Sequence, residues 1–368
     1  MNRRKVLLAM SGGVDSSAAA VILINLGYYV EGATMRLWSD DEASTEKNIH
    51  GAAEICRMLG IKHHVLDYKD EFKDEIITYF LNEYQKGHTP NPCVMCNRLF
   101  KFGRFYNDAV SLGFDFISTG HYARIAERNG KKALVCAKYL QKDQSYVLYN
   151  LKQEMLEHII FPLGDKSKEE ARKAAADFNL PSADSPESQE ICFIKNDDYI
   201  EFLNKFGRCA VKSGNFIDTS GNVLGQHNGI TNYTVGQRKG LGVAFGEPMY
   251  VVSINAEDNT VTLGRNEDTY SSAALCSDFN FINDGCLKSI ESYSNGFSSK
   301  DRNIVQGAAV QAKIRYKSPV ADAYISISDK CLRVDFVKPQ RAVTPGQSVV
   351  LYSGDELLGG GIIDSVIK

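Results

Sequence analysis

The chain has 368 residues, of which 43% are hydrophobic, 24% charged and 10% aromatic, and its formal net charge is −3. This composition excludes a disordered, collagen-like or coiled-coil protein, and the length predicts two or three domains. The slightly acidic balance excludes a uniformly basic nucleic-acid binder but is compatible with a local basic patch. No apolar stretch reaches the roughly 18 residues that a membrane span needs, so we expect a cytoplasmic protein that does not enter a membrane.

Strand and helix patterns alternate over the first third of the chain. Short apolar runs at 5–10, 28–35, 63–68 and 114–119 are separated by helix-length stretches at 15–26, 45–59, 71–86 and 98–112. This alternation predicts parallel βαβ units in a doubly wound sheet. Ligands of such sheets bind beyond the carboxyl ends of the strands. A further helix is expected at 168–178.

The pattern changes beyond about residue 210, where glycines and short β runs dominate. Turn residues recur every eight to twelve residues or so, which is typical of a small antiparallel barrel or sandwich. The expected strands are 249–254, 260–263, 310–314, 323–328, 332–337 and 348–352. The polar, Ser-rich stretch 291–302 is expected to be a loop.

The segment Ser11-Gly12-Gly13-Val14-Asp15-Ser16 lies between the first expected strand and the first expected helix. Its two glycines let the backbone turn tightly and approach a ligand closely. The start of the helix offers unpaired N–H groups to an anion. The segment matches neither the Walker pattern nor the G-x-G-x-x-G pattern, so it predicts a phosphate-binding loop of another kind.

Nine cysteines are many for a protein without an export signal, and they favour metal, redox or nucleophilic roles over disulfides. Cys93 and Cys96 form a C-x-x-C pair before a helix that is expected to begin near Asn97. A thiol at a helix N-terminus near cations has a lowered pKa and reacts as a thiolate. Cys192 is a third candidate. Structural zinc is a weaker alternative because the chain has no second C-x-x-C pair.

Taken in order, these motifs resemble those of the bacterial tRNA-specific 2-thiouridylases, a family of PP-loop ATP pyrophosphatases. The S-G-G-x-D-S loop at 11–16 is the PP-loop signature. The likeness continues with T-P-N-P at 89–92, C-N at 96–97, T-G-H-Y at 119–122, K-D-Q-S-Y at 142–146, I-C-F-I at 191–194, G-Q-R-K-G-L-G at 236–242, R-Y at 315–316, V-T-P-G-Q at 343–347 and G-G-G-I-I at 359–363. The resemblance therefore runs almost from end to end.

The resemblance implies an α/β fold and a reaction. A doubly wound PP-loop domain of the adenine nucleotide alpha hydrolase-like kind would occupy 1–200, a small central domain 201–270, and an antiparallel β-barrel that binds tRNA 271–368. The family replaces the 2-oxygen of the wobble uridine with sulfur in tRNAs for Lys, Glu and Gln. It uses ATP with Mg²⁺ and releases AMP and pyrophosphate. The sulfur donor, a cysteine desulfurase or a sulfur-carrier protein, stays open.

The resemblance also implies roles for single residues. Cys192 would carry the incoming sulfur as a persulfide, and Cys96 would be the nucleophile that attacks it, leaving a Cys96–Cys192 disulfide. Asp15 would take part in catalysis. The residues implied to bind ATP are Ala9, Met10, Ser11, Gly12, Gly13, Val14, Asp15, Ser16, Met35 and Gly120. Those implied to contact tRNA are Asn91, Pro92, Cys93, Lys142, Asp143, Gln144, Arg315 and Tyr316.

Cys93 departs from the family pattern, which usually has Asp at this position. Cys93 can replace that Asp beside the target base, or serve as a spare resolving thiol. In a third interpretation Cys93, Cys96 and Cys192 hold three irons of a [4Fe–4S] cluster, which would make Cys192 a ligand rather than a persulfide carrier. The sequence leaves these three interpretations open.

Two stretches, 97–132 and 311–344, each carry seven Lys or Arg against three Asp or Glu, with aromatic residues between them. Such stretches suit an RNA backbone and its exposed bases, although a solvated face beside a core has the same composition. Two alternative functions remain. One is another PP-loop adenylating ligase, of the amidation or lysidine type, and the other is a tRNA-binding protein without catalysis. Paired thiols argue against the first, and the intact loop argues against the second.

Overall fold

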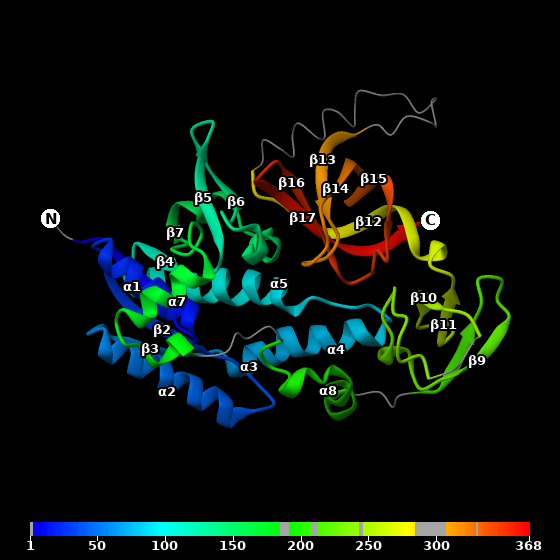
Figure 1. The fold of residues 1–368 in the computed structure, drawn as a ribbon, viewed down its shortest axis with the longest axis horizontal. Coiled ribbons are helices and arrows are strands. Elements are labelled where there is room, and N and C mark those ends of the chain that lie inside the picture. The colour runs from blue at the N-terminus through cyan, green and yellow to red at the C-terminus, as the bar shows by residue number, and fades with distance from the viewer. Residues whose placement is uncertain (1–2, 185–190, 208–211, 243–245, 284–306, 329) are drawn as a thin grey trace. The chain divides into compact units, whose positions relative to one another are not determined.

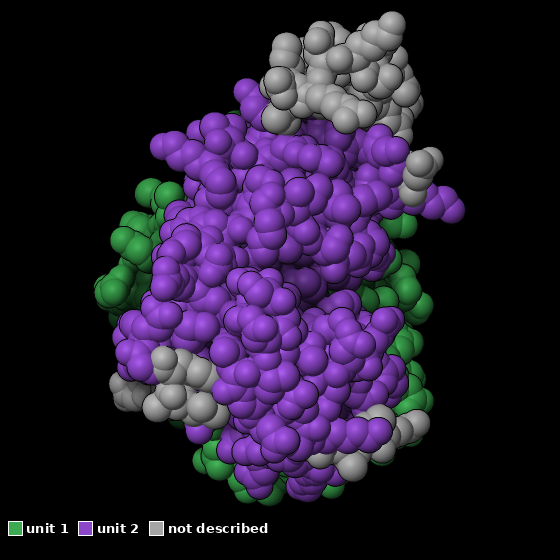
Figure 2. Space-filling model, turned by 90° about the vertical axis from the view of Figure 1, so that its right-hand side faces the viewer, with its two compact units in different colours: residues 1–76, 93–197, 355–357 green, residues 77–92, 198–354, 358–368 purple. Residues whose placement is uncertain are grey.

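We describe a computed structural model of the chain, in which residues 3–184, 191–207, 212–242, 246–283, 307–328 and 330–368 are described. The expected loop 291–302 lies outside them. Contacts divide the chain into two compact units, coloured separately in Figure 2. Unit 1 comprises 1–76, 93–197 and 355–357, and unit 2 comprises 77–92, 198–354 and 358–368. Within the described residues no helix is long and apolar enough to span a bilayer.

Unit 1 is built on a parallel sheet with the strand order β3-β2-β1-β4-β7 (Figure 1). Its strands are β1 (Lys5–Ala9), β2 (Tyr29–Arg36), β3 (His63–Asp67), β4 (Phe116–Ser118) and β7 (Ile159–Ile160). The pairings β1–β2, β1–β4, β2–β3 and β4–β7 are all parallel. The predicted doubly wound parallel sheet is therefore confirmed.

Alternation along β1 explains how both faces of the sheet are covered. Val6 and Leu8 pack into an apolar cluster with α1 (Val14–Asn25) and α2 (Glu42–Met58), and α7 (Lys168–Ala176) joins the same cluster through Ala175. Successive side chains of a strand point to opposite faces. Leu7 therefore faces the other side of the sheet, where it is also fully buried.

The two helices expected at 71–86 and 98–112 exist but are interrupted. The first consists of α3 (Lys69–Phe72), a π-helical turn (Lys73–Ile77) and α4 (Thr78–Gln85). The second consists of α5 (Pro92–Cys96), a π-helical stretch (Asn97–Arg104) and α6 (Phe105–Ser111). The expectation that this helix begins near Asn97 is wrong. It begins at Pro92, because proline lacks the N–H that the first helical position leaves unpaired.

A hairpin of β5 (Ala123–Arg128) and β6 (Lys131–Cys136) also belongs to unit 1, and Val135 pairs with Glu356. Its two-residue turn is Asn129-Gly130, with φ of 50° and 73°. Asn-Gly is a strong sequence signal for such turns, because both positions need positive φ. Sequence reasoning did not use that signal.

Unit 2 contains a four-stranded sheet and a closed antiparallel barrel, as predicted for the C-terminal half. The sheet has the order β10-β11-β8-β9, and the barrel runs β12-β15-β14-β13-β16-β17 and closes by pairing β12 with β17. The sheet strands are β8 (Gly214–Ile217), β9 (Val223–His227), β10 (Tyr250–Asn255) and β11 (Thr260–Gly264). The barrel strands are β12 (Tyr270–Phe281), β13 (Ala308–Lys313), β14 (Ala321–Ser328), β15 (Cys331–Arg341), β16 (Ser348–Ser353) and β17 (Glu356–Ile367). Helix α8 (Tyr199–Phe206) precedes both.

Candidate active site

The predicted phosphate loop joins the carboxyl end of the central strand β1 to α1. Gly12 has a φ of 79°, and a Cβ there would lie 2.9 Å from the Asn48 carbonyl oxygen of α2. Gly13 is the N-cap of α1 and has no side chain with which to cap the helix. Unpaired N–H groups at the start of a helix, together with the helix dipole, favour an anion. The loop therefore has the construction of a phosphate site.

Hydroxyl groups of the loop hold its shape. The Ser16 and Ser17 hydroxyls donate to the Gly13 carbonyl oxygen at 3.0 and 2.9 Å. Ser11 N–H donates to Ser16 Oγ at 3.3 Å. Met10, the residue before the loop, is bonded to the neighbouring strand β2, because its N–H donates to the Ala33 carbonyl at 2.8 Å. Ala9 ends β1 and Met35 lies near the end of β2, so both are at the same edge of the sheet.

Gly120 follows β4 at this edge. A Cβ on Gly120 would lie 3.1 Å from the carbonyl carbon of Asp15 and 3.1 Å from the Ser16 nitrogen. Only a residue without a side chain allows the loop backbone to come this close. The structure therefore brings Gly120 to residues 11–16, as the resemblance implied.

Asp15 is held by two residues that sequence reasoning did not select. Tyr122 Oη donates to Asp15 Oδ1 at 2.8 Å, and Lys168 Nζ donates to the same oxygen at 2.8 Å. Lys168 is only 9% exposed, which is rare for a lysine unless its charge is paired. It is the first residue of α7, whose N-cap Ser167 forms a capping box with Glu170. The capping box was readable in the sequence, but the contact between α7 and the loop was not.

The three candidate thiols all lie in unit 1. Cys96 is buried in α5, while Cys93 and Cys192 are exposed, and none of the three forms a disulfide. They are close enough to interact electrostatically, because charges on Cys93 and Cys96 both raise the pKa of Cys192. Cys192 precedes Phe193, whose ring packs on Phe72 with centroids 5.9 Å apart. The structure thus brings Cys192 to the C-x-x-C pair from almost a hundred residues away along the chain.

The expected lowering of the thiol pKa is wrong. Desolvation by surrounding protein atoms raises the pKa of Cys96 to about 11 and that of Cys192 to about 12. Desolvation also raises the pKa of Cys93, although the residue as a whole is exposed. Lys101 lowers the pKa of all three thiols but is outweighed, because removing water disfavours a thiolate strongly.

The thiols do not form a metal site in this structure. Among the described residues no group of three or more His, Cys, Asp or Glu side chains is arranged to hold a metal ion. Cys93, Cys96 and Cys192 are all described, so the ligand set suggested for an iron–sulfur cluster is not assembled here.

The residues implied to contact tRNA lie in different surroundings. Asp143 is 7% exposed and accepts hydrogen bonds from Ala137 N–H at 2.8 Å and Ser145 Oγ at 2.7 Å. Gln144 Oε1 accepts from Tyr122 N–H at 2.9 Å. These two side chains therefore support the chain beside Tyr122, while Lys142 is half-buried.

The side chain of Arg315 likewise makes hydrogen bonds within its own unit, unit 2. Its Nη2 donates to the Val235 carbonyl at 3.2 Å, to Thr344 Oγ1 at 2.6 Å and to the Ala342 carbonyl. Tyr316 lies half-buried beside Lys313, whose Nζ is 5.8 Å from the ring centroid. Asn91 is half-buried and Pro92 is buried. The implied tRNA contacts of these residues stay predictions.

Comparison with known proteins identifies the family. A model described as the tRNA methyl transferase HUP domain matches residues 4–196, one described as the tRNA methyl transferase PRC-barrel domain matches 200–265, and one described as the aminomethyltransferase beta-barrel domain matches 296–363. The chain is 47% identical to "tRNA-specific 2-thiouridylase MnmA" of Acetivibrio thermocellus, covering 99% of this chain and 100% of the relative. It is 42% identical to the protein of the same name from Clostridioides difficile, covering 98% of each.

The chain belongs to the tRNA-specific 2-thiouridylase family. The phosphate loop and the three thiols lie in the part that matches the HUP-domain model of this family. Among solved structures, the U34-tRNA thiolase NcsA from Methanococcus maripaludis with its [4Fe–4S] cluster is 19% identical, covers 56% of this chain and 68% of its own, and has a TM-score of 0.35. A likeness this low supports no conclusion about the thiouridylase described here.

Proposed function

We propose that this chain is a tRNA-specific 2-thiouridylase that uses ATP to replace the 2-oxygen of the wobble uridine with sulfur in tRNAs for Lys, Glu and Gln. One observation carries the proposal. A PP-loop and three electrostatically coupled thiols occur in one unit of a chain that is 47% identical over its whole length to a thiouridylase.

The first step activates the uridine. The O2 atom attacks the α-phosphorus of ATP while N3–H loses its proton to solvent. The bond between the α-phosphorus and the oxygen that bridges it to the β-phosphate breaks, and pyrophosphate leaves with the electron pair of that bond. The N–H groups at the start of α1 and the Gly12-Gly13 backbone are suited to bind the phosphates. Mg²⁺ accompanies ATP by binding its phosphates, and Asp15 is the only carboxylate of loop residues 9–16. Lys168 and Tyr122 hold Asp15 in one orientation.

The second step transfers sulfur. The terminal sulfur of a Cys192 persulfide attacks C2 of the adenylated uridine, and AMP leaves with the original O2. Cys96, as a thiolate, then attacks Cys192 Sγ and breaks the sulfur–sulfur bond, which forms a Cys96–Cys192 disulfide. The C2 sulfur leaves with the electron pair, and a proton taken up from solvent at N3 gives 2-thiouridine. A reducing thiol must restore both cysteines before the next turnover. The desulfurase or sulfur carrier that loads Cys192 is a further part of the proposal.

The raised thiol pKa values constrain this scheme. Cys96 is a neutral thiol at neutral pH, because its pKa is about 11. The nucleophile therefore has to lose its proton when the substrate binds. Adding AMP or RNA beside the thiols changes their solvation and charge, so the pKa of the resting protein is the starting point rather than the catalytic value.

The experiment is a thiolation assay with unmodified tRNA, ATP and a persulfide-generating cysteine desulfurase. We expect one AMP for each 2-thiouridine formed, and loss of thiolation in Cys96→Ala and Cys192→Ala. Cys331→Ser in the barrel is the matched control and should retain activity. A chain that makes AMP but joins ammonia or an amine to its substrate, and that survives Cys96→Ala, is a ligase instead. Binding of tRNA without AMP formation would indicate the non-catalytic alternative.

A further inference from the structure

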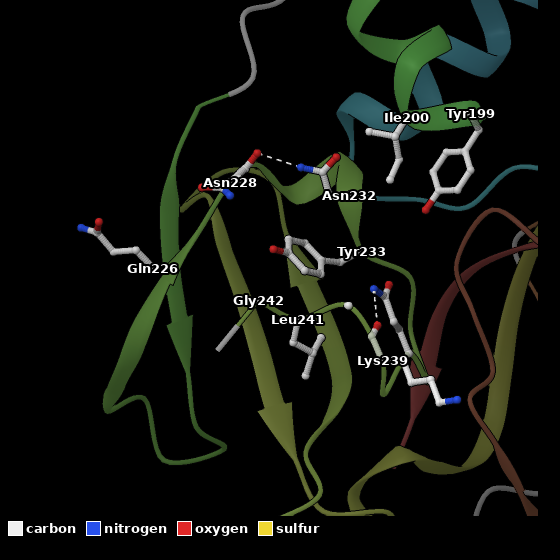
Figure 3. A pocket seen from close by; sticks show the side chains of 11 residues that line it. Tyr199, Ile200, Gln226, Asn228, Asn232, Tyr233, Lys239, Leu241 and Gly242 are labelled. Atoms are coloured by element: carbon white, nitrogen blue, oxygen red, sulfur yellow. Dashed lines mark hydrogen bonds between the residues drawn. The ribbon is translucent and has the colours of Figure 1, made fainter. Parts of the chain in front are cut away.

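The motif G-Q-R-K-G-L-G at 236–242 has no part in the chemistry above, yet it forms one wall of a cavity. The cavity has a volume of about 560 Å³, and all of its lining residues belong to unit 2. Figure 3 shows these residues. Tyr199 and Ile200 of α8 line one side, and Tyr233 and Leu241 line the other. A volume of this size is within the range of small-molecule sites.

The loop that forms this wall is held in one conformation. Gln237 N–H donates to the Thr234 carbonyl at 2.9 Å, Thr234 N–H donates to Gln237 Oε1 at 3.0 Å, and Gln237 Nε2 donates to the Lys239 carbonyl at 3.0 Å. Gly236, Gly240 and Gly242 have φ between 76° and 88°, which other residues rarely adopt. Arg315 supports the loop from the barrel through its bond to the Val235 carbonyl. The binding surface is therefore preformed.

The charge of the lining favours an anionic or neutral ligand. None of the lining residues in the described part of the chain carries a carboxylate, and Lys239 is exposed at the rim with Arg238 beside it. The amide side chains of Asn228 and Asn232 supply neutral hydrogen-bonding groups, although Asn232 Nδ2 already donates to the Asn228 carbonyl oxygen at 2.8 Å. Gln226 also belongs to the lining, but in Figure 3 its side chain points away from the other lining side chains. Gln226 and Asn228 are exposed.

The remaining lining is apolar or aromatic. Ile200 is 37% exposed, and Leu241 and Tyr233 form the floor as part of an apolar cluster. The Tyr199 ring is immobilised, because it stacks on Tyr84 with an interplanar angle of 26° and its hydroxyl bonds Thr234. Flat apolar surface, amides and a cation at the rim are the three features that recognise a base, its polar edge and its phosphate.

We propose that this cavity binds one unstacked nucleotide of the tRNA substrate, at a position other than the reacting uridine. The base lies between Ile200 and Leu241, the amides contact its edge, and Lys239 and Arg238 contact its phosphate. The inference rests on the proposed function, because it takes tRNA as the substrate. It adds a second nucleotide site, which would anchor the tRNA in unit 2.

The test compares two tryptophan variants of α8 in the full-length enzyme. Ile200→Trp fills the cavity, whereas Asn204→Trp makes an uncharged change at an exposed position that does not line it. Dissociation constants for unmodified tRNA are measured by fluorescence anisotropy, and single-turnover thiolation is measured at saturating tRNA. We expect Ile200→Trp to weaken tRNA binding about tenfold and to leave the single-turnover rate at saturation unchanged. Asn204→Trp should match the unaltered protein in both.

A second pair of variants tests the role of the Lys239 charge without adding a large side chain. Lys239→Ala should weaken tRNA binding and lower the salt dependence of affinity by about one unit of log–log slope, while Lys212→Ala, at an exposed lysine outside the cavity, should not. Equal affinities of Ile200→Trp and Asn204→Trp, in proteins with the same melting temperature, would overturn the inference.

Two further outcomes separate the possible causes of failure. If the unaltered protein neither binds nor thiolates tRNA, the proposed function fails and the cavity cannot be a tRNA site. If the protein thiolates tRNA, but the cavity binds free AMP or UMP by calorimetry and Ile200→Trp abolishes only that binding, the cavity is a free-nucleotide site and the tRNA assignment is wrong.

Discussion

At the scale of single residues, the contacts of Asp15 explain more of the site than the loop motif does. The motif predicted a phosphate loop, and the structure adds Lys168 and Tyr122, which converge on one carboxylate oxygen. Residue types at known spacing indicate the loop, but nothing in the sequence pairs position 15 with position 168. The thiols show the same limit. Surrounding protein atoms desolvate Cys96 and Cys192 and raise their pKa values, whereas the neighbouring residues in the sequence suggest lowered values.

Removing the Lys168 ammonium should impair ATP activation. Lys168→Met leaves Asp15 without its charged donor, and a hydrogen bond between charged groups contributes about 1.5–3 kcal/mol. We expect AMP formation in the presence of tRNA to slow by about 10-fold to 100-fold. Lys173→Met is the matched control on the same helix, because Lys173 is exposed and pairs with the exposed Asp177 at 2.9 Å. Equal rates in the two variants would show that Lys168 has no part in the site.

Alkylation should report the raised thiol pKa directly. With a pKa of about 12, Cys192 has a thiolate fraction that grows about tenfold for each pH unit throughout the neutral and mildly alkaline range. Its iodoacetamide reaction rate, measured by peptide mass spectrometry, should therefore rise without a plateau up to about pH 10. Free cysteine, the reference, levels off above its pKa of about 8.5. A plateau for Cys192 near neutral pH would mean that the thiolate is already stabilised in the resting protein.

At the scale of elements, glycines and a helix cap bring the site together. The tips of β1 and β4 meet because Gly120 leaves room for the backbone of Asp15 and Ser16. Helix α7 presents Lys168 because its capping box fixes the first turn. Gly120 and the capping box can each be seen in the local sequence. Each affects the site, however, through a contact with the loop at 11–16, which is distant along the chain.

Adding one carbon at Gly120 should separate the loop from β4. The Cβ of Gly120→Ala would meet two backbone atoms at 3.1 Å, which forces the loop to move. We expect a loss of about 1–3 kcal/mol in the free energy of unfolding and a higher KM for ATP. Gly51→Ala is the control, because nothing lies within 4 Å of its Cβ position inside α2. That variant should be neutral or more stable by up to about 1 kcal/mol in urea denaturation.

The helix cap can be tested independently of the lysine it positions. Ser167→Ala removes the hydroxyl that accepts Glu170 N–H at 3.2 Å and should cost about 1 kcal/mol of stability. AMP formation should fall, but less than in Lys168→Met, because the ammonium is still present. Ser167→Asp supplies another cap and should restore both stability and rate. Failure of the aspartate to restore the rate would mean that the cap does not act through Lys168.

At the scale of the whole molecule, the tertiary structure shows which partners the basic side chains of the two stretches, 97–132 and 311–344, contact. In 97–132, Arg104 pairs with Glu75 at 2.6 Å, and Arg124 and Arg128 pair with Asp355 at 3.3 and 3.5 Å. In 311–344, Arg315 is bonded internally and Arg333 pairs with Asp335 at 2.6 Å. Folding therefore brings Glu75 and Asp355 next to part of the excess positive charge of 97–132. In 311–344 the excess is not offset in this way, because Asp335 belongs to the same stretch and the hydrogen-bond acceptors of Arg315 described above are neutral groups.

The iron content of the whole protein tests the cluster interpretation. Because Cys93, Cys96 and Cys192 are not arranged as a metal site in the structure, we expect no stoichiometric iron or acid-labile sulfide after anaerobic purification. We also expect Cys93→Asp to retain tRNA thiolation. About four irons per chain, lost in Cys96→Ala, would make the three cysteines cluster ligands and exclude the persulfide relay.

The sequence by itself determined the class of fold, the phosphate loop and the family resemblance. Periodicity, turn residues and motif order are local properties, so the parallel sheet, the barrel and the loop at 11–16 could be predicted from them. Only the tertiary structure decided that Lys168 and Tyr122 hold Asp15, that Asp143 and Arg315 bond within their own units, and that burial keeps Cys96 protonated. Those outcomes depend on which groups, distant along the chain, come next to each side chain and how much water they displace from it. Neither can be read from the residue type at a single position.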